Sequence, residues 1–182
     1  MEFKRGFSPF KILTNMSFKG HKEKAPKKIK CVVITVSDTR DEKSDTSGNI
    51  IKELLIKESH EIVDYRIIKD EPEEIKKYLK YIFYIEDVQA IILSGGTGIS
   101  KRDRTYEVVK TLIEKRIDGF GEIFRYLSFK EIGSPAIMSR AIAGICNGKL
   151  IISIPGSENA VKLAMERLIL PELGHIIWEA NR

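Results

Sequence analysis

Short apolar runs alternate with amphipathic segments along the chain from residue 31 onward. The β-branched run at 31–36 is followed by a polar loop and then by apolar residues at helical spacing between 50 and 55. The predicted strands are residues 31–36, 62–68, 90–93 and 150–154. The predicted helices hold residues 50–55, 75–83 and 108–113, a helix-rich stretch runs from about 121 to 143, and further helices begin near Ser157 and at Pro171.

Strands that are almost wholly apolar and alternate with helices indicate how the layers are arranged. Such strands are buried on both faces, so the pattern predicts a three-layer α/β/α fold, a mostly parallel sheet covered by helices on both faces. In sheets of this kind, ligands bind beyond the carboxyl ends of the strands. The loops after Val36, Ile68, Leu93 and Ile154 are therefore expected to converge on one site.

Length and composition are those of a single globular domain. The chain has 182 residues, of which 42% are hydrophobic and 31% are charged. No apolar run approaches the roughly 18 residues of a membrane span, so we expect a soluble protein with no membrane contact. Cys31 and Cys146 lack the close spacing of a metal or redox pair, and we interpret both as buried thiols in the reducing cytoplasm. The histidines form no ligand cluster in the sequence, which argues against a zinc site.

The positive charge is concentrated near the amino terminus. The net charge is +5, and six lysines with one glutamate occur between Lys19 and Lys30. Without that segment the charges nearly balance, so a nucleic-acid partner is not expected. The first 28 residues also carry phenylalanines without a helical or alternating period. We predict a flexible basic extension over residues 1–28, with docking to a partner as the alternative, and one domain over 29–182.

The loop after the third predicted strand is rich in glycine. It reads Ser94, Gly95, Gly96, Thr97, Gly98. Glycines this close together allow positive φ and a close approach of backbone amides to a ligand, which is how an anion-binding nest forms. The spacing matches neither the P-loop nor the dinucleotide fingerprint. Taken alone, the loop is also explained as a tight turn.

Acidic residues stand beside this loop in the predicted fold. Asp103, Thr105 and Glu107 lie at the entry of the following helix, and Asp70 follows the second strand. Each carboxylate alone is explained by its favourable position near a helix N-terminus. Together, Asp70 and Asp103 at one sheet edge offer oxygen ligands for a Mg²⁺ ion that keeps waters and nucleotide phosphates as its other ligands.

Three further segments carry polar groups. The turn Pro155-Gly156-Ser157 ends the last predicted strand, and its serine can cap the next helix. Ser37 and Asp38 open the loop after the first strand, and Ser139 and Arg140 lie between the third and fourth strands. Each has a plain structural interpretation, respectively a helix cap, a polar loop and a solvated helix face.

The ordered set of motifs is more specific than any one of them. The motifs are Thr35-Val36-Ser37-Asp38, Asp45-Thr46-Ser47-Gly48, Ser94-Gly95-Gly96-Thr97-Gly98, Asp103-x-Thr105-x-Glu107, Gly119-Phe120-Gly121-Glu122, Ser139-Arg140-Ala141 and Pro155-Gly156-Ser157. The set resembles the MoaB/Mog family of molybdenum cofactor biosynthesis proteins, from about Lys30 to the final helix. Tyr106 stands where proline is frequent in that family, and Ser157 where asparagine or glutamine occurs. Neither change removes a proposed catalytic group.

The resemblance implies a molybdopterin adenylyltransferase, which transfers AMP from ATP to molybdopterin with the help of Mg²⁺ and releases pyrophosphate. It implies that Asp70 and Asp103 are the catalytic carboxylates and the magnesium ligands. The implied substrate-binding and nucleotide-binding residues are Ser37, Asp38, Ser94, Gly95, Gly96, Thr97, Gly98, Thr105, Glu107, Ser139, Arg140, Pro155, Gly156 and Ser157. The alternative is a molybdopterin-binding paralogue without adenylyl transfer, against which the presence of both carboxylates argues.

The resemblance also implies partners. The family assembles as homo-oligomers, so a trimer or a hexamer built from trimers is expected, with other cofactor-biosynthesis proteins as further partners. The remaining partners are the small-molecule substrates, ATP and molybdopterin.

Overall fold

The computed structural model describes residues 25–182, so the predicted extension 1–28 lies almost entirely outside the described residues. The strands are β1 Lys30–Val36, β2 Glu61–Ile68, β3 Ala90–Ser94, β4 Lys115–Arg116, β5 Ile142–Cys146 and β6 Lys149–Ile154. The helices are α2 Thr46–Lys57, α3 Pro72–Phe83, α4 Thr105–Leu112, α5 Asp118–Ile132, α6 Glu158–Ala164 and α7 Leu170–Asn181, with a short 3-10 helix η1 Ser134–Met138 and a π-helical turn η2 Met165–Ile169.

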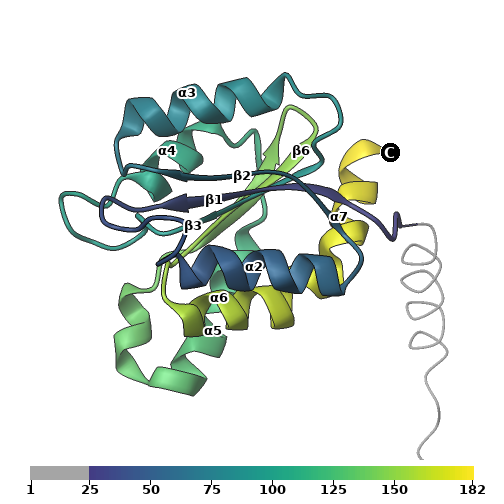
Figure 1. Ribbon diagram of the computed structural model, residues 1–182. Coiled ribbons are helices and arrows are strands. Elements are labelled where there is room, and N and C mark those ends of the chain that lie inside the picture. Colours follow the sequence, from purple (N-terminus) through teal and green to yellow (C-terminus); the bar gives the residue numbers. More distant parts are fainter. Residues whose placement is uncertain (1–24) are drawn as a thin grey trace, which may run out of the picture.

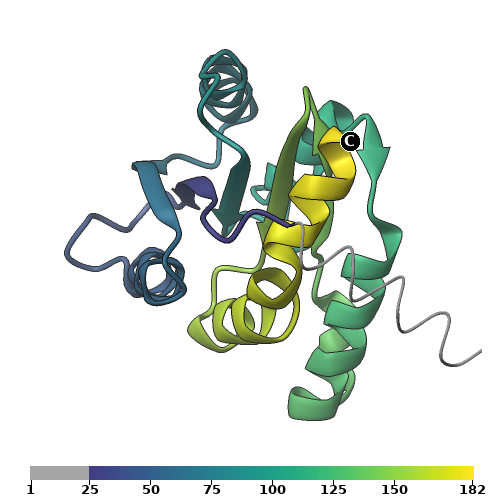
Figure 2. The ribbon, with the colours of Figure 1, turned by 90° about the vertical axis from the view of Figure 1, so that its right-hand side faces the viewer.

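The strands form one sheet in the order β2-β1-β3-β6-β5-β4. Strands β2, β1, β3 and β6 run parallel to one another, whereas β5 is antiparallel to β6. Helices α3 and α4 cover one face, and α2, α5, α6 and α7 cover the other (Figures 1 and 2). The predicted three-layer α/β/α fold with a mostly parallel sheet is confirmed.

Alternation of apolar side chains explains why the central strands need helices on both sides. Along β1, Cys31 and Val33 pack in one core cluster, and Val32 and Ile34 pack in the other. Strand β3 divides its side chains in the same way, so neither face of the central sheet meets water. Each fully buried side chain of this kind contributes roughly 1.5–3 kcal/mol relative to exposure.

The structure corrects the end of the helix-rich stretch predicted for 121–143. Helix α5 ends at Ile132, and residues 142–146 form β5, which pairs with β6 across a tight hairpin. Asn147 and Gly148 make the turn with φ of 50° and 70°. An Asn-Gly pair between two apolar runs is a strong hairpin signal, which our prediction overlooked. The two-residue β4, also missed, is too short to show a period.

The structure also corrects the helix start at Pro171. Helix α6, the π-helical turn η2 and α7 follow one another without a break, so Pro171 is the second residue of α7 and not a new beginning. The missing amide of proline costs little here, because the wider π turn just before it already departs from the regular hydrogen-bond ladder.

Candidate functional site

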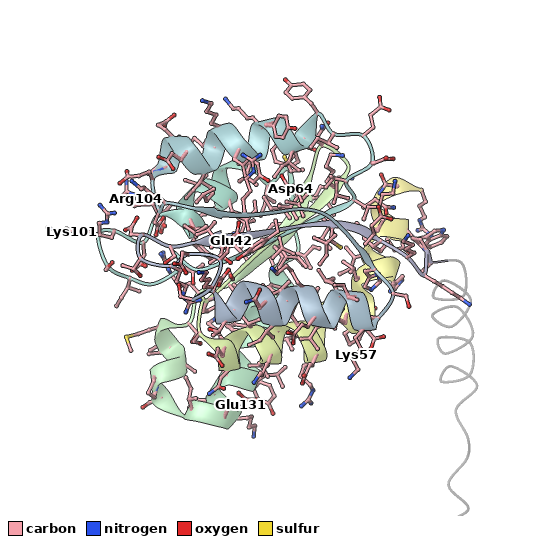
Figure 3. The ribbon with its side chains drawn as sticks, viewed as in Figure 1. Glu42, Lys57, Asp64, Lys101, Arg104 and Glu131 are labelled. Carbon is pink, nitrogen blue, oxygen red and sulfur yellow. The ribbon has the colours of Figure 1, made fainter. Side chains whose placement is uncertain are left out.

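The four loops at the carboxyl ends of the parallel strands meet at one edge of the sheet, as predicted. The amide of Ser37 donates to the carbonyl of Ile68 at 2.9 Å, and the amide of Gly95 donates to the carbonyl of Ile154 at 3.0 Å. These two bonds join the loops in pairs. Lys101 and Arg104 mark this edge in Figure 3, opposite the chain's carboxyl terminus.

The glycine loop after β3 requires glycine at two positions. Gly95 and Gly96 have φ of 100° and 62°. A Cβ on Gly95 would lie 2.3 Å from the Val36 carbonyl oxygen, and one on Gly96 would lie 2.1 Å from Thr105 Oγ1 and 2.5 Å from Asp70 Oδ2. Because no side chain fits there, the backbone of the loop lies directly against the Asp70 carboxylate.

One backbone amide of this loop donates a hydrogen bond within the protein, and three others remain available to a ligand. The Gly95 amide already donates to Ile154 inside the sheet edge, so it is not available to bind a phosphate. This corrects our expectation that the amides from Gly95 to Gly98 bind together. Within residues 25–182, the amides of Gly96, Thr97 and Gly98 donate to no other backbone carbonyl. The predicted anion-binding role of the loop therefore falls to these three amides.

Asp70 is a nearly buried carboxylate, with 8% of its surface exposed. It accepts hydrogen bonds from the Arg104 amide at 3.2 Å and from Thr105 Oγ1 at 3.3 Å. Burial raises the pKa of Asp70 above its ordinary value, against the lowering effect of these two donors, and the charges of Asp103 and Asp38 raise it further. A carboxylate in such surroundings is stabilised in its charged form by an added cation.

Asp103 lies against Gly98 of the same loop. Its Oδ2 accepts from the Ser100 amide at 2.9 Å, and a Cβ on Gly98 would come within 2.6 Å of that oxygen. Both predicted metal ligands, Asp70 and Asp103, thus lie against glycines of one loop, close enough for their charges to interact.

Arg140 fastens the glycine loop to α4. Its Nε donates to the Thr97 carbonyl at 2.8 Å and its Nη2 to the Gly98 carbonyl, while Nη1 pairs with Glu107. The guanidinium also lies over the Tyr106 ring, 4.7 Å from its centroid. Burial would raise the pKa of Glu107, but the hydrogen bond and charge of Arg140, together with a backbone hydrogen bond and the charge of Arg104, bring the pKa of that carboxyl below its ordinary value. Arg140 is therefore part of the loop's framework and not a solvated arginine.

A buried carboxylate, Asp45, organises the loop after β1. Its side chain is 0% exposed and accepts from the Gly48 amide at 3.0 Å, from the Tyr65 hydroxyl at 2.6 Å and from Arg40 Nη1 at 3.3 Å. Burial would raise its pKa, but the hydrogen bonds from Thr35, Tyr65 and Gly48 together bring it below the ordinary value. Asp45 is thus ionised and fully paired.

The Asp45 loop holds the turn after β6. Arg40 Nη2 donates to the Gly156 carbonyl at 3.3 Å, and Ser47 Oγ donates to the same oxygen at 2.7 Å. A Cβ on Gly156 would lie 3.0 Å from the Cα of Gly95, so this turn and the glycine loop are in backbone contact. A chain of contacts therefore connects Asp45 to the glycine loop.

Comparison with known proteins identifies the family. A family model described as "Probable molybdopterin binding domain" matches residues 32–175, a range that includes every loop of the site. The chain belongs to the MoaB/Mog family of molybdenum cofactor biosynthesis proteins.

The match to individual relatives extends over nearly the whole length of both proteins. Molybdenum cofactor biosynthesis protein B of Halalkalibacterium halodurans is 52% identical over 165 residues, 90% of this chain and 97% of the relative. The Bacillus subtilis protein of that name is 46% identical over 168 residues, 92% of this chain and 99% of the relative. The crystal structure of the tungsten cofactor synthesizing protein MoaB from Pyrococcus furiosus is 39% identical, with a TM-score of 0.79 over 87% of this chain and 100% of that one.

Some functional groups of this MoaB/Mog protein were missed by sequence reasoning. Arg102 Nη2 pairs with Asp38 at 2.5 Å and its Nη1 lies 3.5 Å from Glu71, so it bridges two loops at the mouth of the site. Asp45 was noted only as part of a motif of the family resemblance, with no role of its own. Neither Arg102 nor Tyr65 belongs to a motif, so no sequence signal could have found them.

Other predicted residues of the MoaB/Mog motifs serve the loops themselves. Ser37 Oγ accepts from the amides of Thr39 and Arg40, and Ser157 Oγ accepts from the Ala160 amide to cap α6. The buried Ser94 hydroxyl lies 3.5 Å from that of Thr35. Ser139 follows η1, where its amide donates to Ala136. Binding roles for these residues stay predictions.

No helix within residues 25–182 has the length and apolar character that crossing a membrane requires.

Proposed function

We propose that the protein is a molybdopterin adenylyltransferase, which transfers AMP from ATP to the terminal phosphate of molybdopterin. The observation that carries the proposal is that the nearly buried Asp70 carboxylate and Asp103 both lie against one glycine loop with three available amides. Acidic side chains beside an anion-binding loop are what a metal-assisted reaction of phosphates requires.

In the proposed reaction, an oxygen of the pterin's terminal phosphate attacks the α-phosphorus of ATP. One P–O bond forms, the bond from the α-phosphorus to the oxygen that bridges to the β-phosphate breaks, and pyrophosphate leaves with the electron pair. Positioning and neutralisation of charge carry most of the catalysis, because no protein atom needs to form a covalent bond. The amides of Gly96, Thr97 and Gly98 bind phosphate oxygens, and Arg140 keeps the loop in place for them.

Magnesium fits the donors at this edge. Within residues 25–182, no group of three or more histidine, cysteine, aspartate or glutamate side chains is arranged to hold a metal ion by itself. Mg²⁺ is usually bound by one or two carboxylates together with substrate phosphates and waters, which is what Asp70 and Asp103 would supply. When bound, the ion would neutralise charge on the reacting phosphates.

The test is to incubate the full chain with molybdopterin, Mg²⁺ and ATP labelled at the α-phosphate. We expect one labelled AMP–pterin adduct and one pyrophosphate for each pterin consumed. Omission of Mg²⁺ should abolish both products. Pterin that binds without forming an adduct would contradict the proposal and would instead support the paralogue that binds molybdopterin without transferring AMP.

We also propose that the protein self-associates through an apolar patch on α5 and η1. The patch consists of Tyr126, Phe129, Ile132, Ile137 and Met138, each half exposed or more. Exposed apolar side chains gathered in one place often mark an interaction surface, and a second copy of the chain is the occupant that the family resemblance implies.

Light scattering should therefore report a trimer or a hexamer at micromolar concentrations. Ile137, 84% exposed, is the residue to change, and Ile137→Asp should shift the protein toward the monomer because it places a charge in the interface. The matched control is Tyr84→Asp, since Tyr84 is 86% exposed but follows α3 on the other face of the sheet. A parent protein that stays monomeric throughout would contradict the proposal.

A further inference from the structure

A cavity lies near the glycine loop, and the reaction proposed above assigns it no role. Its volume is about 190 Å³, and its walls come from the start of α4, from β4, from the first turns of α5 and from the start of β5. Because β5 is antiparallel to β6, the start of β5 lies at the same sheet edge as the carboxyl ends of the parallel strands. The cavity therefore shares its edge with the phosphate-binding loop.

One side chain pair connects the cavity with that loop. Tyr106 lines the cavity, and Arg140 lies over the Tyr106 ring while it donates to Thr97 and Gly98 of the loop. A ligand that occupied the cavity and reached past this pair would place its far end at the available amides.

The cavity depends on Gly121. A Cβ on Gly121 would lie 2.6 Å from the Ala141 carbonyl oxygen, so only glycine allows the first turn of α5 to approach β5 this closely. Gly121 belongs to the Gly119-Phe120-Gly121-Glu122 motif, to which the reaction at the glycine loop gives no role. Glu122 and Arg125 of the same helix line the cavity.

Charges around the cavity are balanced. Arg116, the last residue of β4, is paired with Asp118, the first residue of α5. Glu122 and Arg125 stand three residues apart on one helix, a spacing that favours an ion pair, yet neither forms one with any side chain of residues 25–182. Two acids and two arginines give no net charge, so the lining suits a neutral polar ligand and not a phosphate.

We propose that this cavity binds the pterin ring of the second substrate, with Glu122 as the residue that selects it. The amino-substituted edge of a pterin presents a ring N–H beside an exocyclic amino group, two adjacent donors that one carboxylate accepts together. Adenine presents an acceptor beside its amino group, so it does not match a carboxylate in this way. Arg125 supplies donors for the oxo group and ring nitrogens of the pterin.

The size of the cavity agrees with one planar ring system. At about 190 Å³ it is smaller than the roughly 300–1,000 Å³ of sites that enclose a whole drug-sized ligand. The ring would fill it, and the phosphate-bearing remainder of the substrate would extend past Tyr106 toward the glycine loop. This inference rests on the proposed function for the identity of the substrate.

The experiment compares two glutamates on one helix. Glu122→Gln removes the double acceptor, while Glu131→Gln makes the same chemical change in the last turns of α5, away from the cavity (Figure 3). The full chain is titrated with fluorescent hydroxymethylpterin and, separately, with AMP. We expect pterin affinity to fall tenfold or more in Glu122→Gln, or about 1.4 kcal/mol, with AMP affinity unchanged and Glu131→Gln like the parent.

The outcomes separate this inference from the proposed function. Equal pterin affinity in the parent and in Glu122→Gln, or no pterin binding to the parent at all, overturns the cavity assignment even if AMP transfer is observed. Selective loss of pterin binding supports the cavity even if the parent transfers no AMP. Loss of pterin and AMP affinity to the same degree also overturns it, because it would mean that Glu122 acts on the whole site.

Discussion

Asparagine in place of Asp103 should lower AMP transfer by a hundredfold or more while leaving pterin affinity and the melting temperature nearly unchanged. The carboxylate is proposed to hold Mg²⁺, and metal-assisted stabilisation of charge is worth several kcal/mol, of which each 1.4 or so changes the rate tenfold. Asparagine keeps an oxygen that can accept from the Ser100 amide, the contact that Asp103 makes at 2.9 Å. The loop conformation therefore survives the change, and only the charge is lost.

The same change at Asp70 gives an independent check. Asp70→Asn should also reduce transfer severely, and it should not lower stability, because burial already raises the pKa of this carboxyl and disfavours its charge. Asp87→Asn is the matched control, since Asp87 pairs with Lys30 at the opposite end of the sheet. Single-turnover transfer at saturating Mg²⁺, pterin affinity and melting temperature are measured on the same samples. Turnover of Asp103→Asn within about threefold of the parent, under 1 kcal/mol, would mean that Asp103 merely favours a helix start.

Alanine in place of Asp45 should cost about 3 kcal/mol of unfolding free energy, or about 6–12 °C in melting temperature. The carboxylate is 0% exposed, and its loss leaves the Tyr65 hydroxyl, the Gly48 amide and Arg40 without their acceptor. Removing one partner from a buried charged network is costly because the remaining groups stay desolvated. Transfer should fall as well, because Arg40 also donates to the Gly156 carbonyl beside the glycine loop.

Asp41→Ala is the control for this variant. Asp41 lies in the same loop but is exposed and bonds only within its own turn, so its removal should shift the melting temperature little. Equal shifts of the melting temperature in the two variants would show that Asp45 contributes no more to stability than an exposed carboxylate of the same loop.

Acid titration of stability gives a second measure of Asp45. Its folded pKa lies below the unfolded value of 3.8, so the unfolded chain binds the proton more readily. The contribution of Asp45 is therefore complete above pH 3.8 and is lost as the pH falls through the folded pKa. Denaturant unfolding of parent and Asp45→Asn should accordingly differ most at neutral pH and converge in acid. A difference that stays constant down to the lowest pH would contradict this account.

The local sequence pattern was sufficient to predict the strands at the centre of the sheet. The strands near 31–36, 90–93 and 150–154 follow from runs that are almost wholly apolar, because a strand buried on both faces has few polar positions. The hairpin β5–β6 was missed although Asn147-Gly148 signals it, because the runs on either side are short. The meeting of the glycine loop, Asp70 and Asp103 at one sheet edge also followed from the sequence, since parallel strands bring their carboxyl ends together.

The sequence by itself thus determined the layers of this protein and the sheet edge at which its candidate site lies. Only the tertiary structure decided which groups are available there: that the Gly95 amide is used by Ile154, that Arg140 is committed to loop carbonyls, and that Asp45 pairs with Tyr65. The reason is that periodicity acts within one element, whereas these contacts depend on strand order and register. Tyr65 lies opposite Val33 of β1 in that register, a pairing that no local pattern specifies.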